Sequence, residues 1–164
     1  MSTVVGVFES KSQAERAVNK IREAGITNDK ISIAAREENV RGEGGRARNN
    51  GEGGMLEQNL SDGTATGGTL GGLAGLMAGA GALAIPGVGP IIAAGPIAAG
   101  LSGAAAGGIA GGLVDFGIPR ASGQEYEEEI KRGGLLAVVE ADDSKVDDVA
   151  SYMRHNGARK VEKH

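Results

Sequence analysis

The sequence predicts an α+β fold in which the two ends of the chain form one domain around an inserted, uncharged segment. A strand–helix–strand pattern near the start of the 164 residues is repeated near the end. Between the two copies, about fifty consecutive residues from Gly63 to Val114 carry no charge. A chain of this length supports one domain with an appendage, and these two observations divide it accordingly.

The first strand–helix–strand pattern lies near the start. Residues 3–8 are rich in β-branched and aromatic side chains and predict a mostly buried strand. Ser10 and Gln13 have the spacing of a capping box, and Gly25 suits the end of the helix that it opens. Residues 30–35 alternate and predict a second strand. The helix between them has one apolar face, formed by Ala14, Ala17, Val18 and Ile21.

The end of the chain repeats this plan. Residues 135–141 predict a strand, Ser144 is a candidate N-cap, and residues 159–163 predict a short last strand. Residues 124–132, which precede this pattern, are acidic and then basic, an order that favours a short helix. The apolar face of the last helix is formed by Val146, Val149, Ala150 and Met153.

Two such halves fit together most simply in a ferredoxin-like βαββαβ arrangement, since right-handed crossovers place both helices on one face of the sheet. We therefore predict a split ferredoxin-like domain over residues 1–38 and 124–164. Residues 39–62 are polar and glycine-rich and predict a flexible linker, because such a composition cannot compensate for its ordering entropy. Residues 63–116 are then the insertion.

The insertion predicts a glycine-zipper α-helical hairpin. Glycines four apart form one smooth ridge on a helix, where another helix can approach closely. The predicted helix-packing and oligomerisation residues are Gly63, Gly67, Gly71, Gly75 and Gly79 in the first arm and Gly103, Gly107 and Gly111 in the second. A parallel row in the second arm contains Gly100, Ala104, Gly108 and Gly112. The hairpin turn is assigned to Pro86, Gly87, Gly89, Pro90 and Pro96.

Two environments would accommodate such a hairpin. Glycine costs about 1 kcal/mol relative to alanine in a water-exposed helix, so close packing has to compensate for so many glycines. Each arm has about the length of a hydrocarbon core, but lacks an aromatic belt and is poor in large apolar residues. We expect the hairpins either to pack together in a homo-oligomer or to associate with membrane lipid. No secretory signal is visible at the start, which indicates a cytoplasmic protein.

Chemical function is not indicated by the sequence. The chain has no cysteine, and its only histidines, His155 and His164, have no metal-ligand spacing around them, so we assign no catalytic, cofactor-binding or metal residues. No small-molecule substrate and no cofactor is expected. The net charge of -4 argues against a nucleic-acid partner, and the arginines between residues 41 and 48 are diluted by glutamates without interleaved aromatic residues. The protein is therefore predicted not to be an enzyme.

One motif string resembles a known family. Residues 84–96 read Ala-Ile-Pro-Gly-Val-Gly-Pro-Ile-Ile-Ala-Ala-Gly-Pro, and are followed by a Gly/Ala arm, by Gly117-Ile118-Pro119, by a Tyr-Glu-Glu-Glu helix and by Arg132-Gly133-Gly134. Over nearly the whole chain, this order resembles the bacterial general stress (heat-induced stress) protein family. The resemblance implies a role in general stress responses, with no known catalytic activity and no assigned ligand residues.

We thus expect a non-enzymatic general stress protein that self-assembles or associates with membrane through its hairpin. The alternative is a small-molecule sensor or regulatory module, because ferredoxin-like domains often bind ligands at dimer interfaces. That alternative rests on fold analogy alone.

Overall fold

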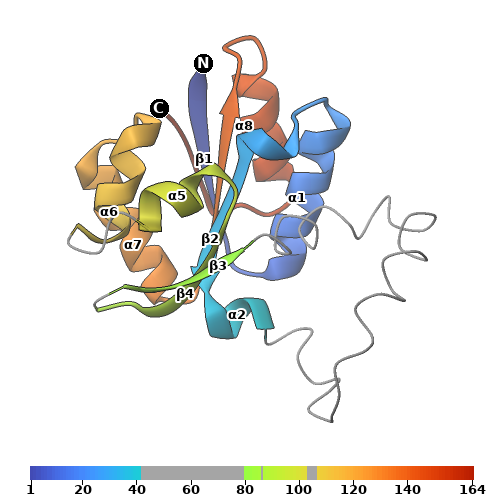
Figure 1. Cartoon of the computed structure of the whole chain (residues 1–164). Coiled ribbons are helices and arrows are strands. Elements are labelled where there is room, and N and C mark those ends of the chain that lie inside the picture. Colours follow the sequence, from blue (N-terminus) through green and yellow to red (C-terminus); the bar gives the residue numbers. More distant parts are fainter. Residues whose placement is uncertain (42–79, 86, 103–106) are drawn as a thin grey trace, which may run out of the picture.

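The computed structural model describes residues 1–41, 80–85, 87–102 and 107–164, arranged around one antiparallel sheet (Figure 1). The strands are β1 (Ser2–Phe8), β2 (Ile31–Arg36), β3 (Gly81–Ile85), β4 (Gly89–Ala94), β5 (Leu135–Ala141) and β6 (Lys160–Lys163). The helices are α1 (Lys11–Glu23), α2 (Glu37–Arg41), α5 (Pro96–Ser102), α6 (Gly108–Leu113), α7 (Arg120–Lys131) and α8 (Val146–His155). Two single 3-10 turns, η1 (Asn28–Lys30) and η2 (Val114–Phe116), complete the described elements.

The sheet has six strands in the order β3-β4-β2-β5-β1-β6, and all neighbours are antiparallel. The four strands from the chain ends occupy the order β2-β5-β1-β6. β5 lies between β1 and β2, pairing Leu135 with Phe8 on one side and Val139 with Ile31 on the other. The predicted α+β class is confirmed, and the chain ends supply four neighbouring strands of the sheet, to which the predicted insertion adds β3 and β4.

The start of α1 follows its sequence signal, and the start of α8 does not. The capping box of α1 is present, because the Ser10 side chain accepts from the backbone N–H of Gln13 while the Gln13 side chain accepts from that of Ser10. The prediction for α8 is wrong by one residue: Lys145, not Ser144, is the N-cap, since a turn from Lys145 N–H to Asp142 C=O precedes the helix.

Two further boundaries differ from the predictions. α7 begins at Arg120, four residues before the predicted start, directly after Pro119 at its N-cap. The first three residues of the predicted linker, 39–41, belong to the short helix α2, which carries Glu37 and Glu38 in its first turn, where they favour the helix dipole.

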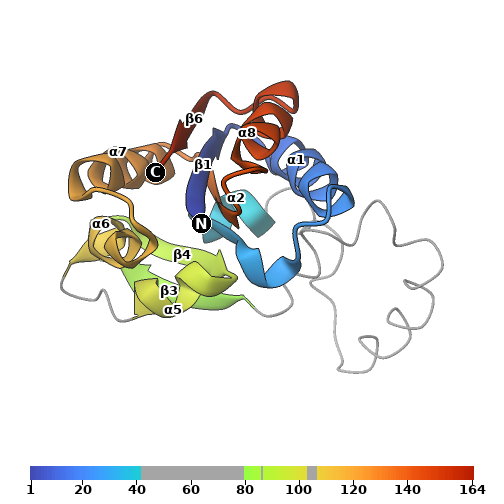
Figure 2. The ribbon, with the colours of Figure 1, turned by 90° about the horizontal axis from the view of Figure 1, so that it is seen from above.

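One face of the sheet is covered by α1 and α8 (Figure 2). Alternate residues of the central strands point into this layer, among them Val4, Ile33 and Val139. The helices contribute the apolar faces predicted from the sequence, Ala14, Ala17, Val18 and Ile21 from α1 and Val146, Val149, Ala150 and Met153 from α8. The prediction that both helices lie on the same face is confirmed.

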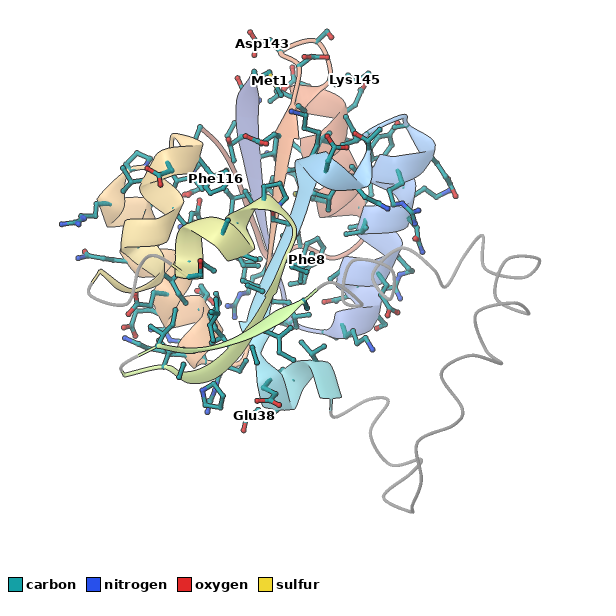
Figure 3. All side chains as sticks on the ribbon, viewed as in Figure 1. Met1, Phe8, Glu38, Phe116, Asp143 and Lys145 are labelled. Atoms are coloured by element: carbon teal, nitrogen blue, oxygen red, sulfur yellow. The ribbon has the colours of Figure 1, made fainter. Side chains whose placement is uncertain are left out.

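The opposite face is covered by α5, α6 and α7 (Figures 1 and 2). The other set of alternate strand residues, including Val5, Ala34 and Val138, packs against Ile97 of α5 and Tyr126 of α7. Thr3 on β1 donates from its hydroxyl at 2.8 Å to the carbonyl of Phe116, the residue labelled in Figure 3, and this bond ties η2 to the sheet. The described part of the uncharged segment therefore packs on the sheet that the chain ends form.

The predicted helical hairpin is wrong where the structure describes it. Residues 81–94 are the β-hairpin β3–β4, and the second arm is divided into α5 and α6 instead of one long helix. Of the predicted turn residues, Gly87 lies in the turn between β3 and β4, with φ +83, and the Val88 N–H donates to the carbonyl of Ile85. Gly89, with φ +90, and Pro90 are instead the first residues of β4. Pro96 is the first residue of α5.

A β-hairpin forms here because the positive φ at Gly87 lets the chain reverse between two strands. Ile85, Ile91 and Ile92 are β-branched and fit the pleated, half-buried surface of the strands. β4 then adds to β2, with Ile33 opposite Ala94, and satisfies backbone groups that would otherwise remain at an open edge. Pairing with an existing sheet thus outweighs the weak helix preference of this glycine-rich sequence.

Several predicted residues lie outside the described residues: Gly63, Gly67, Gly71, Gly75 and Gly79 of the first arm, Pro86, and Gly103 of the second arm. The same holds for residues 42–62 of the predicted linker. Within the described ranges, no helix has the length and apolar character needed to cross a membrane.

Candidate interaction surface

The described part of the uncharged segment reaches the protein surface with small, uncharged residues. Its large side chains, such as Ile91, Ile97 and Leu113, are fully buried against the sheet. Its exposed residues are Gly81, Ala82, Ala84, Gly87, Pro90, Ala99, Ser102, Gly107 and Val114. We call this set the neutral surface. Of these, Val114 is the one large apolar side chain, and it is 46% exposed.

The two edges of the sheet differ in charge. At one edge, β3 has the sequence Gly-Ala-Leu-Ala-Ile and belongs to the neutral surface. At the other, β6 has the sequence Lys-Val-Glu-Lys, and charges on an edge strand oppose pairing with another strand. Lys163 of β6 is also held by Asp147 at 2.6 Å. Only the β3 edge has the composition of a site for further strand pairing.

Small residues let α5, α6 and α7 approach one another closely. A Cβ atom on Gly100 of α5 would lie 2.8 Å from the carbonyl oxygen of Gly112 of α6, and one on Gly123 of α7 would lie 2.8 Å from the Cα of Ala110. Both distances are too short for real atoms. The row that contains Gly100 and Gly112 therefore serves packing within the molecule.

The predicted oligomerisation row of the same arm is placed differently. A Cβ atom on Gly111 would have no neighbour within 4 Å, and Gly107 is exposed. Gly111 thus leaves open space next to Gly107 of the neutral surface.

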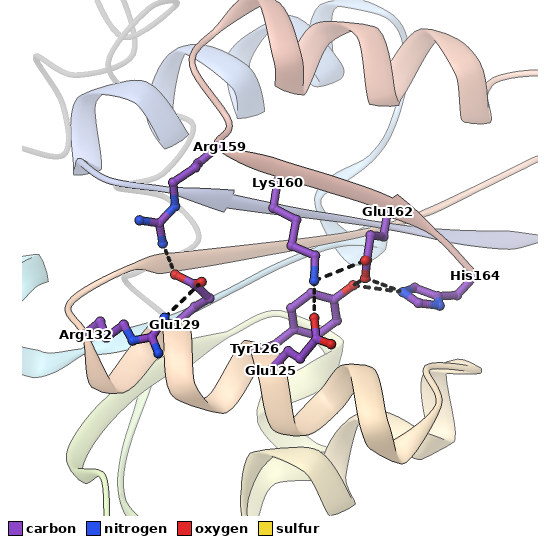
Figure 4. A network of polar contacts seen from close by, with 8 residues as sticks. All are labelled: Glu125, Tyr126, Glu129, Arg132, Arg159, Lys160, Glu162 and His164. Atoms are coloured by element: carbon purple, nitrogen blue, oxygen red, sulfur yellow. Dashed lines mark hydrogen bonds and ion pairs between the residues drawn. The ribbon is translucent and has the colours of Figure 1, made fainter.

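A polar network joins α7 to β6 (Figure 4). The buried Tyr126 donates its hydroxyl to the Glu162 carboxylate, and Nε2 of His164 lies 2.9 Å from that hydroxyl. Lys160 pairs with Glu125 and lies 3.1 Å from Glu162, and its ammonium is 5.5 Å from the centre of the Tyr126 ring. Arg159 completes the connection by pairing with Glu129.

The pKa values in this network favour a structural role. Burial, followed by the hydrogen bond to Glu162, raises the pKa of Tyr126 far above its ordinary value, so the phenol keeps its proton. Burial alone would raise the pKa of Glu162, but hydrogen bonds from Tyr126 and Lys160 outweigh it and hold that pKa below 4.5. A protonated phenol donates a stable hydrogen bond to an ionised carboxylate. Neither group is poised to exchange protons near neutral pH.

The acidic run of α7 is dispersed over different partners. Glu125 pairs with Lys160, Glu127 and Glu128 with Lys131, and Glu129 with Arg159. Among the described residues, no group of three or more His, Asp or Glu side chains could hold a metal ion. His155 is exposed and bonds with the Ser151 carbonyl one helical turn earlier.

Two shallow hollows occur near α2. One of about 200 Å³ lies between Ser10, Asn39 and Gly133, and one of about 260 Å³ lies beside Arg36 and Pro90. Glu38, labelled at the lower end of Figure 3, borders both. Both hollows are smaller than a typical pocket for a drug-sized ligand, which holds about 300 Å³ or more.

Comparisons with protein-family models, with curated proteins and with solved structures found no match for this chain. The sequence signals missed two features of the candidate surface. The free β3 edge was hidden by the prediction of a helix, and the contact between Gly123 and Ala110 joins elements that a single-sequence pattern does not connect.

Proposed function

We propose that this chain is a non-enzymatic, self-assembling protein whose copies associate through the uncharged segment. The neutral surface carries the proposal: each exposed residue of this segment that the structure describes is uncharged, and all but Val114 are small or polar. An ordinary solvated surface carries charges at close intervals, which keep copies apart. Small neutral residues allow backbones to approach closely when a second copy covers them.

The fold family, the protein family and the cellular location are part of the same proposal. The order β2-β5-β1-β6, with two helices on one face, supports the ferredoxin-like arrangement, to which the hairpin β3–β4 and α5 to α7 are added. We further propose that it belongs with the bacterial general stress proteins that its motif string resembles, and that it acts in the cytoplasm, with membrane lipid as a second partner of the same segment. The alternative is a small-molecule sensor, which rests on fold analogy alone.

Sedimentation equilibrium of the full chain over a wide concentration range tests self-assembly. We expect the average mass to rise above that of the 16.4 kDa monomer with concentration. Gly111→Leu should lower this mass while the circular dichroism spectrum is retained, because a side chain at position 111 meets open space within the molecule. Gly111→Ala is the matched control, because a methyl group obstructs the approach of a second copy less than a leucine side chain does. A monomer at every concentration would refute the proposal.

Membrane association is measured separately. The purified chain is mixed with vesicles of neutral and of anionic phospholipid, and flotation is followed in high salt. Flotation that persists in salt supports insertion of the uncharged segment, since electrostatic attachment is screened. Absence of flotation with both lipids would leave self-assembly as the function and remove the membrane from it.

A further inference from the structure

β3 is an edge strand whose outer side is free in the described part of the chain. Its only neighbouring strand there is β4. Gly81, Ala82 and Ala84 are exposed, and no residue of β3 is charged. A neutral edge of this kind is a template for pairing with another strand.

The register of the hairpin shows which backbone groups face outward. Ala84 lies opposite Pro90, which has no backbone N–H, so these two residues form a non-hydrogen-bonded pair. The hydrogen-bonded pairs with β4 then involve Leu83 and the other odd-numbered residues of β3. The N–H and C=O groups of Ala82 and Ala84 therefore point toward the free edge.

A second copy of β3 satisfies these groups in one register. In an antiparallel pair, outward-pointing residues must lie opposite each other. A two-fold axis at Leu83 places Ala82 of one copy opposite Ala84 of the other, and Gly81 opposite Ile85. All five residues of β3 are then paired, and no charge opposes a like charge.

We propose that β3 pairs antiparallel with β3 of a second copy about a two-fold axis at Leu83, so that one continuous sheet runs through a dimer. The inference rests on the proposed self-assembly, of which the β3 pairing is one contact. The two Leu83 side chains meet on the face that carries α5. There they extend an apolar cluster against which Leu83 already packs within its own chain.

Assembly through the β3 edge stops at two copies. Each chain offers one neutral edge, and the opposite edge, β6, carries Lys160, Glu162 and Lys163. A contact between identical strands is isologous and uses each strand once, so it gives a dimer and not a fibre. α5 packs against β3, and its exposed Ala99 and half-buried Ala98 are small enough to let the second copy approach.

A disulfide trap tests the register. The chain has no cysteine, so Leu83→Cys introduces one thiol per copy. The Cα atoms of a directly opposed non-hydrogen-bonded pair lie about 4.5 Å apart, which suits a disulfide. We expect rapid formation of a covalent dimer under mild oxidation. Ala84→Cys is the register control, because its two copies lie diagonally, about 7–8 Å apart, and should link at least about tenfold more slowly.

A charge variant tests the contact without a thiol. Ala82→Lys adds a cation at an exposed edge position and should weaken the dimer by about tenfold or more in sedimentation equilibrium. Ala121→Lys makes the same change at an exposed position of α7, outside the neutral surface, and should weaken the dimer much less. Thermal unfolding monitors the fold of both variants.

The outcomes separate this inference from the proposed function. If the parent chain assembles while Ala82→Lys leaves the mass unchanged and Leu83→Cys does not link, the β3 contact is wrong and self-assembly stands. If Ala82→Lys lowers the melting temperature without changing the mass, a segment of the same chain covers the edge and the inference is again wrong. A monomeric parent chain overturns the proposed function together with the contact.

Discussion

Tyr126 connects two elements through a single hydroxyl group. Its ring is fully buried among the residues under α7, while its hydroxyl reaches Glu162 on β6 and the neighbouring His164. A buried phenol requires a hydrogen-bond partner, and an ionised carboxylate is a strong one. This residue thus anchors a helix of the second layer to the charged edge of the sheet.

Tyr126→Phe should lower the free energy of unfolding by about 1 kcal/mol at neutral pH, because Glu162 is part-exposed and water replaces some of the lost hydrogen bond. Urea unfolding measures the change. Tyr152→Phe, at the other tyrosine, should change stability by less than about 0.5 kcal/mol. Equal losses in the two variants would contradict the role of the Tyr126 hydroxyl.

The pH dependence of this loss follows from the pKa of Glu162. That pKa is lowered in the folded state, so its contribution to stability is present above the ordinary value of 4.5 and is lost as the pH falls through the folded value. The difference between Tyr126→Phe and the parent chain should therefore shrink below about pH 4. Tyr126 itself has a raised pKa, so its contribution is fully present below about pH 10 and is lost only above that pH.

At the scale of elements, α6 is held between α5 and α7 by backbone contact. Gly112 faces Gly100 of α5, and Ala110 faces Gly123 of α7. Three short helices can cover this sheet face because glycine and alanine bring their axes close together. The cost is a low intrinsic helix preference, which the buried side chains of Ile109 and Leu113 offset.

Gly123→Ala and Gly111→Ala form a matched pair that tests this packing. At Gly123 the added methyl would lie 2.8 Å from the Cα of Ala110, and the overlap should destabilise the fold by about 1–2 kcal/mol after the gain in helix preference. At Gly111 the methyl meets open space, so stability should stay the same or rise by up to about 1 kcal/mol. Thermal unfolding of both variants measures the difference. A stable Gly123→Ala variant would show that α7 does not lie against α6.

Elements governed by local signals could be predicted from the sequence, and those governed by pairing could not. Ser10 and Gln13 define the start of α1 within one turn, so the pattern is sufficient. Residues 81–94 contain glycine and alanine at helical spacing, yet β2 offers them an edge that is invisible in a local window. The Pro-Gly turn between Ile85 and Val88, flanked by β-branched residues, was the signal that could have indicated a hairpin.

The uncharged composition of the candidate surface was predicted from the sequence, but the positions of its residues in the fold were not. The uncharged run was recognised, while the oligomerisation ridge stays a prediction: of its residues, Gly107 is exposed and a Cβ atom on Gly111 would have no neighbour within 4 Å. The neighbouring row, with Gly100 and Gly112, packs within the molecule. The position of the sheet decides which of the two adjacent rows faces inward. The free edge of β3 depends on the same long-range placement.

At the scale of the molecule, the described residues form three layers, with helices on both faces of the sheet (Figure 2). β5 lies at its centre: it is paired on both sides, and six of its seven residues are buried. The amide hydrogens of β5 should therefore exchange more slowly with solvent than those of the edge strand β6, because they open only on global unfolding. Hydrogen–deuterium exchange measures this order, and equal rates for the two strands would contradict a central position for β5.

The position of β5 also governs when the protein can fold during its synthesis. β1 and β2 are made early, but they are not neighbours in the sheet, and the strand that separates them begins at Leu135. A nascent chain halted before that residue holds two strands without the partner that joins them. The ribosome must therefore deliver most of the polypeptide before the sheet can close, because the pairing of β1 and β2 through β5 is non-local in sequence.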